Sequence, residues 1–117
     1  MKILIIINDA PYGTEKAYNA LRLAMNIQKE DTSVGVSIFL MADAVGCGLP
    51  NQNTPQGYYN IERMLKSVIL KNGKVKACGT CLEARGLAAV PMIEGVEKSN
   101  MKELTELTLE ADKVITF

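Results

Sequence analysis

The chain has 117 residues, the length of a single domain that can bury a hydrophobic core without disulfide bonds or metal ions to hold it together. Its 13 basic and 13 acidic residues cancel and are mixed along the sequence, which argues against binding nucleic acid or an anionic membrane by bulk charge. The longest aliphatic run, residues 3–7, is too short to span a bilayer or to form the core of a signal peptide. We therefore expect one domain, residues 1–117, in the cytoplasm, with no membrane contact and no direct nucleic-acid contact.

Strands and helices are predicted to alternate along the first half of the chain. Residues 2–7 contain a continuous run of five aliphatic residues, which is typical of a parallel strand that is buried on both faces. A turn-rich loop leads to a predicted helix that begins near Thr14 and carries apolar residues at helical spacing. Residues 34–40 form the second predicted strand. The polar stretch that follows, residues 42–57, has the length of a functional or contact-forming loop.

The second half repeats this alternation with shorter strands. An apolar stripe over residues 61–69 predicts another helix, and residues 74–77 predict a strand that leads directly into the segment CGTC. Ser99 or Asn100 is predicted to cap a last helix through Ala111, and Glu103 lies three residues after Asn100 in a capping-box-like arrangement. Residues 113–117 predict a final buried strand.

This alternation indicates an α/β fold made of right-handed βαβ units, with a parallel sheet that helices cover on both faces. In such sheets, functional sites lie beyond the carboxyl ends of the strands. The loops after the first two predicted strands and the CGTC segment all follow a strand. We therefore expect these three segments at the same edge of the sheet.

The chemistry available at that edge is limited by the absence of histidine. Without imidazole there is no Ser-His-Asp or Cys-His hydrolase, and most zinc enzyme sites are excluded, which leaves a cysteine thiolate as the nucleophile. Cys78 is expected at a strand-to-helix junction, where unpaired N–H groups and the helix dipole favour the ionised thiol. Arg85 is close in sequence and is expected to lower the pKa of Cys78 further. Cys47, between two glycines, is expected to be accessible to solvent.

Several interpretations of the pair Cys78 and Cys81 stay open on the residues alone. C-x-x-C at a helix start is also the arrangement of thioredoxin-like dithiol oxidoreductases, although there it comes early in the domain and not after a third strand. A zinc site needs all three cysteines and a carboxylate such as Asp9 or Asp43, or a second subunit, and no metal is expected. Packing of two unreactive cysteines is the remaining alternative.

Four stretches of the chain, taken in order, resemble the DsrE/DsrF-like sulfur-relay family. They are the first strand followed by APYGTEKA, the second strand running into FLMADAV, the Cys78 segment that ends in Arg85 and Gly86, and the terminal ADKVITF. The similarity covers essentially the whole chain and is greatest to a small, single-domain, homohexameric branch of the family. It implies a three-layer α/β/α domain with a parallel sheet of about five strands, self-assembly into trimers or hexamers, and no cofactor.

The resemblance also implies a role for each thiol. In sulfur-relay members, a cysteine shortly before an Arg-Gly pair accepts sulfane sulfur as a persulfide, and by position Cys78 matches that cysteine. This implies a sulfurtransferase or persulfide carrier with sulfur donor and acceptor proteins as partners. Cys81 departs from the relay subunits, whose acceptor works alone, because a thiol three residues away could attack the persulfide and release sulfide. Gly79, Arg85 and Cys47 are expected to support the site. A dithiol redox protein and a non-enzymatic oligomeric binding module remain the alternatives.

Overall fold

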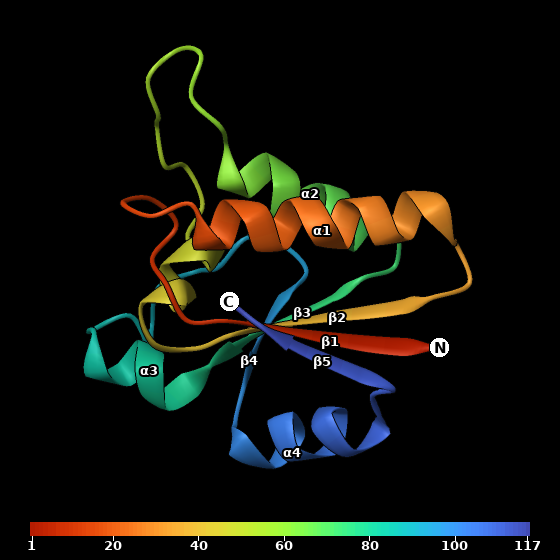
Figure 1. Cartoon of the computed structure of the whole chain (residues 1–117). Helices are drawn as coiled ribbons and strands as arrows, with labels where there is room; N and C mark the ends of the chain where they lie inside the picture. The colour runs from red at the N-terminus through yellow and green to blue at the C-terminus, as the bar shows by residue number, and fades with distance from the viewer.

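Five parallel strands form one sheet in the order β4-β3-β2-β1-β5. The computed structural model describes the whole chain, residues 1–117 (Figure 1). The strands are β1 (Lys2–Ile7), β2 (Gly35–Leu40), β3 (Lys74–Cys78), β4 (Val96–Ser99) and β5 (Lys113–Thr116). The predicted α/β fold with a parallel sheet of five strands is therefore confirmed.

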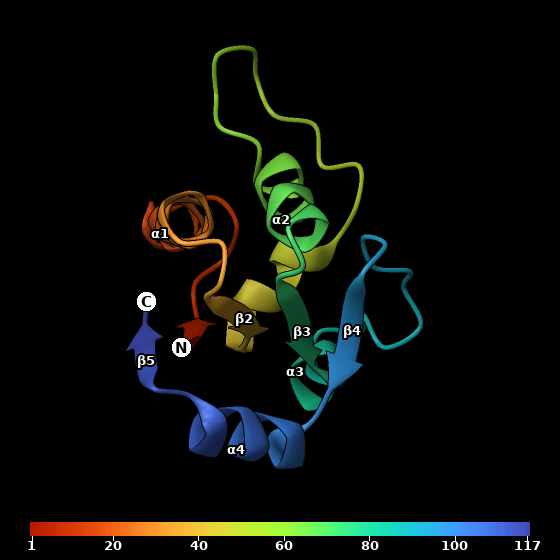
Figure 2. The ribbon, with the colours of Figure 1, turned by 90° about the vertical axis from the view of Figure 1, so that its right-hand side faces the viewer.

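Helices cover both faces of this sheet. Figures 1 and 2 show α1 and α2 side by side on one face, and α3 and α4 on the other. A short 3-10 helix, η1, follows β2 at the carboxyl edge of the sheet. The bounds are α1 (Lys16–Glu30), η1 (Ala42–Gly48), α2 (Ile61–Leu70), α3 (Gly79–Ala84) and α4 (Met101–Glu110). None of these helices is both long enough and apolar enough to pass through a membrane.

The core lies on both faces of the central strands. Ile5 and Ile7 of β1, and Ile38 and Phe39 of β2, have no exposed surface, because one face of each strand packs under α1 or α2 while the other packs toward α3 or α4. Strands covered on both faces need apolar side chains at successive positions, and this explains the unbroken aliphatic run of residues 3–7.

Two predicted segments differ from the structure. The final strand, β5, was expected to be buried, yet Val114 is 44% exposed because β5 lies at the sheet edge and pairs only with β1. The polar stretch 42–57 was expected to be a loop, yet its first seven residues form η1, in which Ala44, Val45 and Cys47 are buried. The pattern of apolar and polar residues in the sequence could not reveal either difference, because the burial of each segment depends on the segments that pack against it.

Asn100 supports the predicted start of α4. Its side-chain Oδ1 accepts a hydrogen bond from the Glu103 backbone N–H at 2.9 Å, which satisfies one of the free donors at the helix end. We predict that Asn100→Ala lowers the free energy of unfolding by about 1 kcal/mol, measured by urea denaturation. Asn100→Ser keeps a capping oxygen and should stay near the wild-type value. Equal losses in both variants would contradict the capping role.

Candidate functional site: a thiol pair at the carboxyl edge of the sheet

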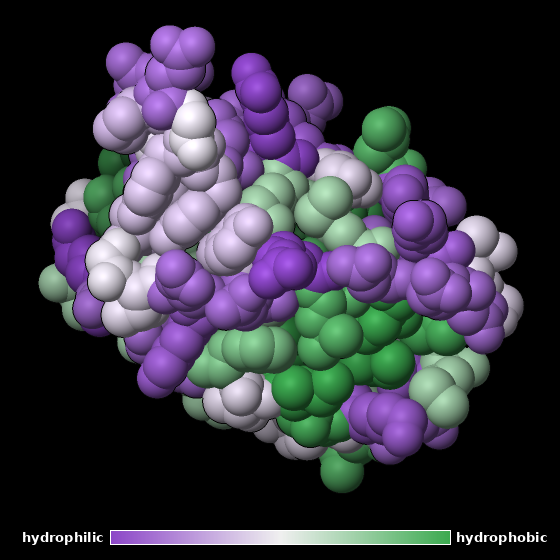
Figure 3. Space-filling view, turned by 45° about the horizontal axis from the view of Figure 1, so that its top comes forward, coloured by the Kyte–Doolittle hydropathy of each residue, from purple (hydrophilic) through white to green (hydrophobic).

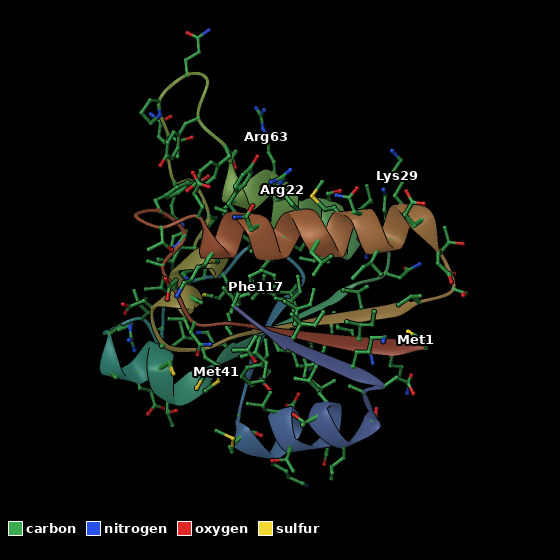
Figure 4. All side chains as sticks on the ribbon, viewed as in Figure 1. Met1, Arg22, Lys29, Met41, Arg63 and Phe117 are labelled. Atoms are coloured by element: carbon green, nitrogen blue, oxygen red, sulfur yellow. The ribbon has the colours of Figure 1, made fainter.

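The register of the sheet brings the ends of three strands to one level. Ile7 of β1 pairs with Leu40 of β2, which in turn pairs with Ala77 of β3. The loop after β1, the helix η1 after β2, and α3 after β3 therefore start at the same edge, as the sequence predicts. Figure 4 shows Met41, the first residue after β2, on the side of the molecule where α3 lies, whereas Met1 lies at the opposite edge.

Cys78 is the last residue of β3 and the N-cap residue of α3. It is only 5% exposed, and its Sγ lies 3.2 Å from the hydroxyl of Thr80. Burial is the largest single influence on its pKa and favours the neutral thiol. Hydrogen bonds from the Thr80 hydroxyl, the Cys81 thiol and the backbone N–H groups of both residues together outweigh burial, and they hold the pKa of Cys78 below its ordinary value.

Cys81 has the opposite electrostatic setting. Burial, followed by its hydrogen bond with Cys78, raises the pKa of Cys81 above its ordinary value. Its Sγ accepts a hydrogen bond from the backbone N–H of Ala42 at 3.2 Å, so the thiol is held against the start of η1. The two cysteines are therefore chemically distinct: Cys78 ionises first, and Cys81 stays protonated and tethered.

The partner of Cys81 is a residue that sequence reasoning missed. Ala42 has a φ of 50°, in the left-handed region that non-glycine residues seldom adopt. This conformation lies where the chain leaves β2 for η1 and turns the Ala42 N–H toward Cys81. An alanine carries no chemical signal in the sequence, so only the backbone geometry identifies it.

Arg85 acts on a different part of the site from the one predicted. Its Nε and Nη2 lie 2.9 and 2.8 Å from Oδ1 of Asp43, and its Nη1 donates to the carbonyl oxygen of Cys81 at 3.1 Å. Arg85 is not among the main influences on the pKa of Cys78: its charge is paired with Asp43, and it lowers the pKa of Cys81 weakly. Arg85 therefore joins η1 to α3 across the site.

Gly79 is required by close packing. A Cβ atom on Gly79 would lie 2.9 Å from the carbonyl oxygen of Ser99, closer than such atoms can approach. The missing side chain lets the start of α3 lie directly against the end of β4. This contact fixes the place where β3 passes into α3, and with it the position of Cys78.

Cys47 is not accessible, contrary to the prediction. It is 1% exposed within η1, and burial raises its pKa to about 12. The glycines beside it serve packing: a Cβ on Gly46 would lie 3.3 Å from Pro11 Cδ, and one on Gly48 would overlap Met92. Small residues around a cysteine thus mark a crowded position here and not an exposed one.

No group of three or more cysteine, aspartate or glutamate side chains in the chain is arranged to hold a metal ion. All three cysteines are free thiols. What the site offers is a low-pKa thiol and a protonated thiol three residues apart, positioned by η1 and by the strand-to-helix junction. Such an arrangement supports thiol exchange and transfer of sulfur between thiols. It defines an α/β protein with a thiol site at its sheet edge.

The family follows from comparison with known sequences. A model of the DsrE/DsrF-like family matches residues 1–117, and the chain belongs to that family. This confirms the resemblance carried by the four ordered stretches of the sequence.

Three relatives match nearly the full chain. Protein YchN of Escherichia coli (strain K12) is 45% identical over 116 residues, which cover 99% of this chain and 98% of YchN. An uncharacterized protein of Methanopyrus kandleri is 43% identical over 115 residues, covering 98% of this chain and 93% of its own. An uncharacterized protein of Methanocaldococcus jannaschii is 40% identical over 117 residues and covers both chains fully.

Solved structures agree with the fold. The crystal structure of the YchN protein from E. coli matches with a TM-score of 0.95 at 45% identity and covers 99% of this chain and 98% of that one. A protein of unknown function from Bacteroides thetaiotaomicron matches with a TM-score of 0.68 at 18% identity, covering 99% of this chain and 94% of its own, and shows the fold alone.

The hydrogen bond between Thr80 and Cys78 leads to a test of the site. Thr80→Val keeps the shape of the side chain and removes the hydroxyl, so we predict that the pKa of Cys78 rises and less thiolate is present at neutral pH. Alkylation of Cys78, followed by mass spectrometry against pH, should be about tenfold slower at neutral pH. Thr80→Ser should retain the wild-type profile. A Thr80→Val profile that overlays the wild type would remove Thr80 from the site.

Proposed function

We propose that this protein carries sulfane sulfur: Cys78 accepts it as a persulfide and passes it to the thiol of an acceptor protein, which makes the chain a sulfurtransferase or persulfide carrier. The observation that carries this proposal is the lowered pKa of a cysteine held at the carboxyl edge of the sheet. Membership of the DsrE/DsrF-like family supports a sulfur-relay role at the family level. Transfer between thiols needs neither histidine nor metal.

The proposed loading step is an exchange at sulfur. The Cys78 thiolate attacks the outer sulfur of a donor persulfide, R–S–SH. A new S–S bond forms on Cys78, the donor S–S bond breaks, and the donor leaves as the thiolate R–S⁻ with the bonding electron pair. Cys78 then holds Cys–S–SH, and transfer to an acceptor thiol repeats the same exchange in the opposite direction. No net oxidation occurs in either step.

Cys81 sets the fate of the loaded sulfur in this proposal. Its thiolate could attack the inner sulfur on Cys78, forming a Cys78–Cys81 disulfide and releasing HS⁻. The raised pKa of Cys81 lowers the amount of attacking thiolate, and the hydrogen bond from Ala42 holds its sulfur in place. Both effects slow release and favour carriage of the persulfide to an acceptor.

A second candidate function is a dithiol redox protein that cycles the same pair between thiols and a disulfide. The effect of each cysteine on the pKa of the other favours it, because two neighbouring thiols with different pKa values can close a disulfide by exchange. A non-enzymatic oligomeric binding module with unreactive cysteines is the third candidate. The three differ in what Cys78 does with a sulfur donor.

Mass spectrometry after incubation with a small-molecule persulfide donor separates these functions. We predict that the reduced protein gains the mass of one sulfur atom on Cys78. Cys78→Ser should gain none, and Cys81→Ser should hold the added sulfur longer than wild type, because the resolving thiol is absent. Cys47→Ser is the matched control, since its thiol is buried, and it should behave as wild type.

Two results would contradict the carrier proposal. Disulfide formation between Cys78 and Cys81 with every donor, in the absence of any sulfur adduct on the Cys81→Ser variant, would favour the dithiol redox protein. Failure of both thiols to react with an alkylating agent in the folded protein would leave only the binding module.

We further propose that the chain forms trimers or hexamers with itself in the reducing cytoplasm. Three free cysteines are compatible with that compartment. Leu109 of α4 is 81% exposed, and β5 has an unpaired edge that carries the exposed Val114. This edge faces the viewer in Figure 1, and the same side shows a broad continuous hydrophobic area in Figure 3. Apolar surface of this kind commonly marks a contact between protein chains.

A charge on β5 tests this assembly. We predict that Val114→Glu shifts the protein to a smaller oligomer or a monomer, measured by size-exclusion chromatography with light scattering, because a carboxylate would have to be desolvated in the contact. Lys29→Glu, an exposed change of charge on α1, is the control and should keep the wild-type mass. An unchanged mass for Val114→Glu would remove β5 from the contact.

A further inference from the structure

The serine at the end of β4, Ser99, has a buried hydroxyl that makes no hydrogen bond. Ser99 is 7% exposed, and its Oγ is buried without a hydrogen-bond partner. Buried hydroxyls are nearly always paired, because an unpaired one loses its hydrogen bonds to water without replacement. Its place in the sheet makes this hydroxyl relevant to the thiol site, because Ser99 is the register partner of Cys78.

The side chains of Ser99 and Cys78 lie on the same face of the sheet. Side chains of residues paired across neighbouring parallel strands point to the same face of the sheet. The pair two residues earlier identifies this face: Nζ of Lys76 lies 3.7 Å from Oε2 of Glu97, its register partner. Lys76 also lies 2.7 Å from Glu103 of α4, so this is the face that α4 covers. Moving two residues along each strand leads from Lys76 and Glu97 to Cys78 and Ser99.

The groups around Ser99 are engaged elsewhere. The Glu103 carboxylate is paired with Lys76. The Ser99 hydroxyl lies close enough to this carboxylate to lower the pKa of Glu103 slightly, the smallest of the influences that do so, but the two groups make no hydrogen bond of normal geometry. The Sγ of Cys78 has the Thr80 hydroxyl as its partner at 3.2 Å and makes no hydrogen bond with Ser99. In the thiol form of the protein, the Ser99 hydroxyl is therefore a donor without a hydrogen bond, on the strand and the face of the sheet that neighbour Cys78.

We propose that Ser99 is a positioning residue for the carried sulfur: its hydroxyl donates a hydrogen bond to the outer sulfur of a persulfide on Cys78. This inference rests on the proposed function. A persulfide places its outer sulfur about 2.0 Å beyond Sγ, the length of one S–S bond. When the persulfide Cys–S–SH loses its proton to solvent, the outer sulfur bears the negative charge, and a hydrogen bond to a charged acceptor is stronger than one to a neutral thiol. The Ser99 hydroxyl keeps its proton in this hydrogen bond.

The proposal gives the two hydroxyls beside Cys78 separate roles. Thr80 contacts the inner sulfur and stabilises the thiolate before loading. Ser99 contributes only after loading, since it is not among the groups that shift the pKa of the Cys78 thiol. Removing the Ser99 hydroxyl should therefore change the properties of the persulfide and leave those of the free thiol unchanged.

The test compares Ser99→Ala, Ser99→Thr and Ser99→Val with wild type. The Thr and Val variants have the same shape and differ in the hydroxyl, so their comparison decides the question even if the Ala variant unfolds. Ser37→Ala in β2 is the matched control, because Ser37 pairs with Lys74 near the amino end of β3, away from the thiols. Each protein is loaded with a small-molecule persulfide donor, and alkylation of the free thiol and of the persulfide is followed by mass spectrometry against pH.

We expect Ser99→Ala and Ser99→Val to lose the loaded sulfur about tenfold faster than wild type, the change expected when one hydrogen bond to a charged group is lost. The pH profile of their persulfide should move to higher pH, while that of the free thiol stays at the wild-type position. Ser99→Thr and Ser37→Ala should match wild type in both.

Other outcomes separate this inference from the function on which it rests. Equal persulfide lifetimes and pH profiles in the Thr and Val variants would overturn the role of Ser99 and leave the carrier proposal intact. If the pH profile of the free Cys78 thiol shifted as much as that of the persulfide, the role of Ser99 would also be overturned, because the hydroxyl would then act before loading. Absence of any sulfur adduct on both wild type and Cys81→Ser would overturn the carrier proposal itself.

Discussion

The parallel pairing of β2 with β1 and β3 is the constraint on which the rest of the structure depends. Because Ile7, Leu40 and Ala77 are in register, the segments that follow all start at one level of the sheet. That level places Ala42 of η1 against Cys81 of α3, although the two residues are 39 positions apart in the sequence. The apolar side chains that hold these strands between two layers of helices thus also set the geometry of the thiol site.

Hydrogen bonds, more than nearby charges, make the two thiols different. Two of the basic residues close to the pair in sequence are engaged elsewhere: Arg85 with Asp43, and Lys76 with carboxylates on β4 and α4. Cys78 is instead surrounded by donors and Cys81 is tethered by a single backbone amide. This difference has a physical reason, since a hydrogen bond acts on one sulfur atom at contact distance, whereas a charge paired with its counterion has little effect further away.

Close packing accounts for several residues that look functional in the sequence. The glycines beside Cys47 suggested an open loop, yet they let η1 pack against Pro11 and Met92. Gly79 lets α3 start against the backbone of β4. In each case a missing Cβ shortens the distance between two segments, and the cysteine nearby is positioned or enclosed as a result.

The sequence by itself determined the α/β class, the parallel sheet, the order of elements and the placement of Cys78 at a strand end, because these follow from periodicity and from local chemistry. It narrowed the cap of α4 to Ser99 or Asn100, and the structure identifies Asn100. The sequence could not determine the burial of Cys47, the tether at Ala42, the partner of Arg85 or the unpaired hydroxyl of Ser99. Each of these depends on a contact between segments far apart in the chain, and such contacts exist only once the sheet has fixed its register.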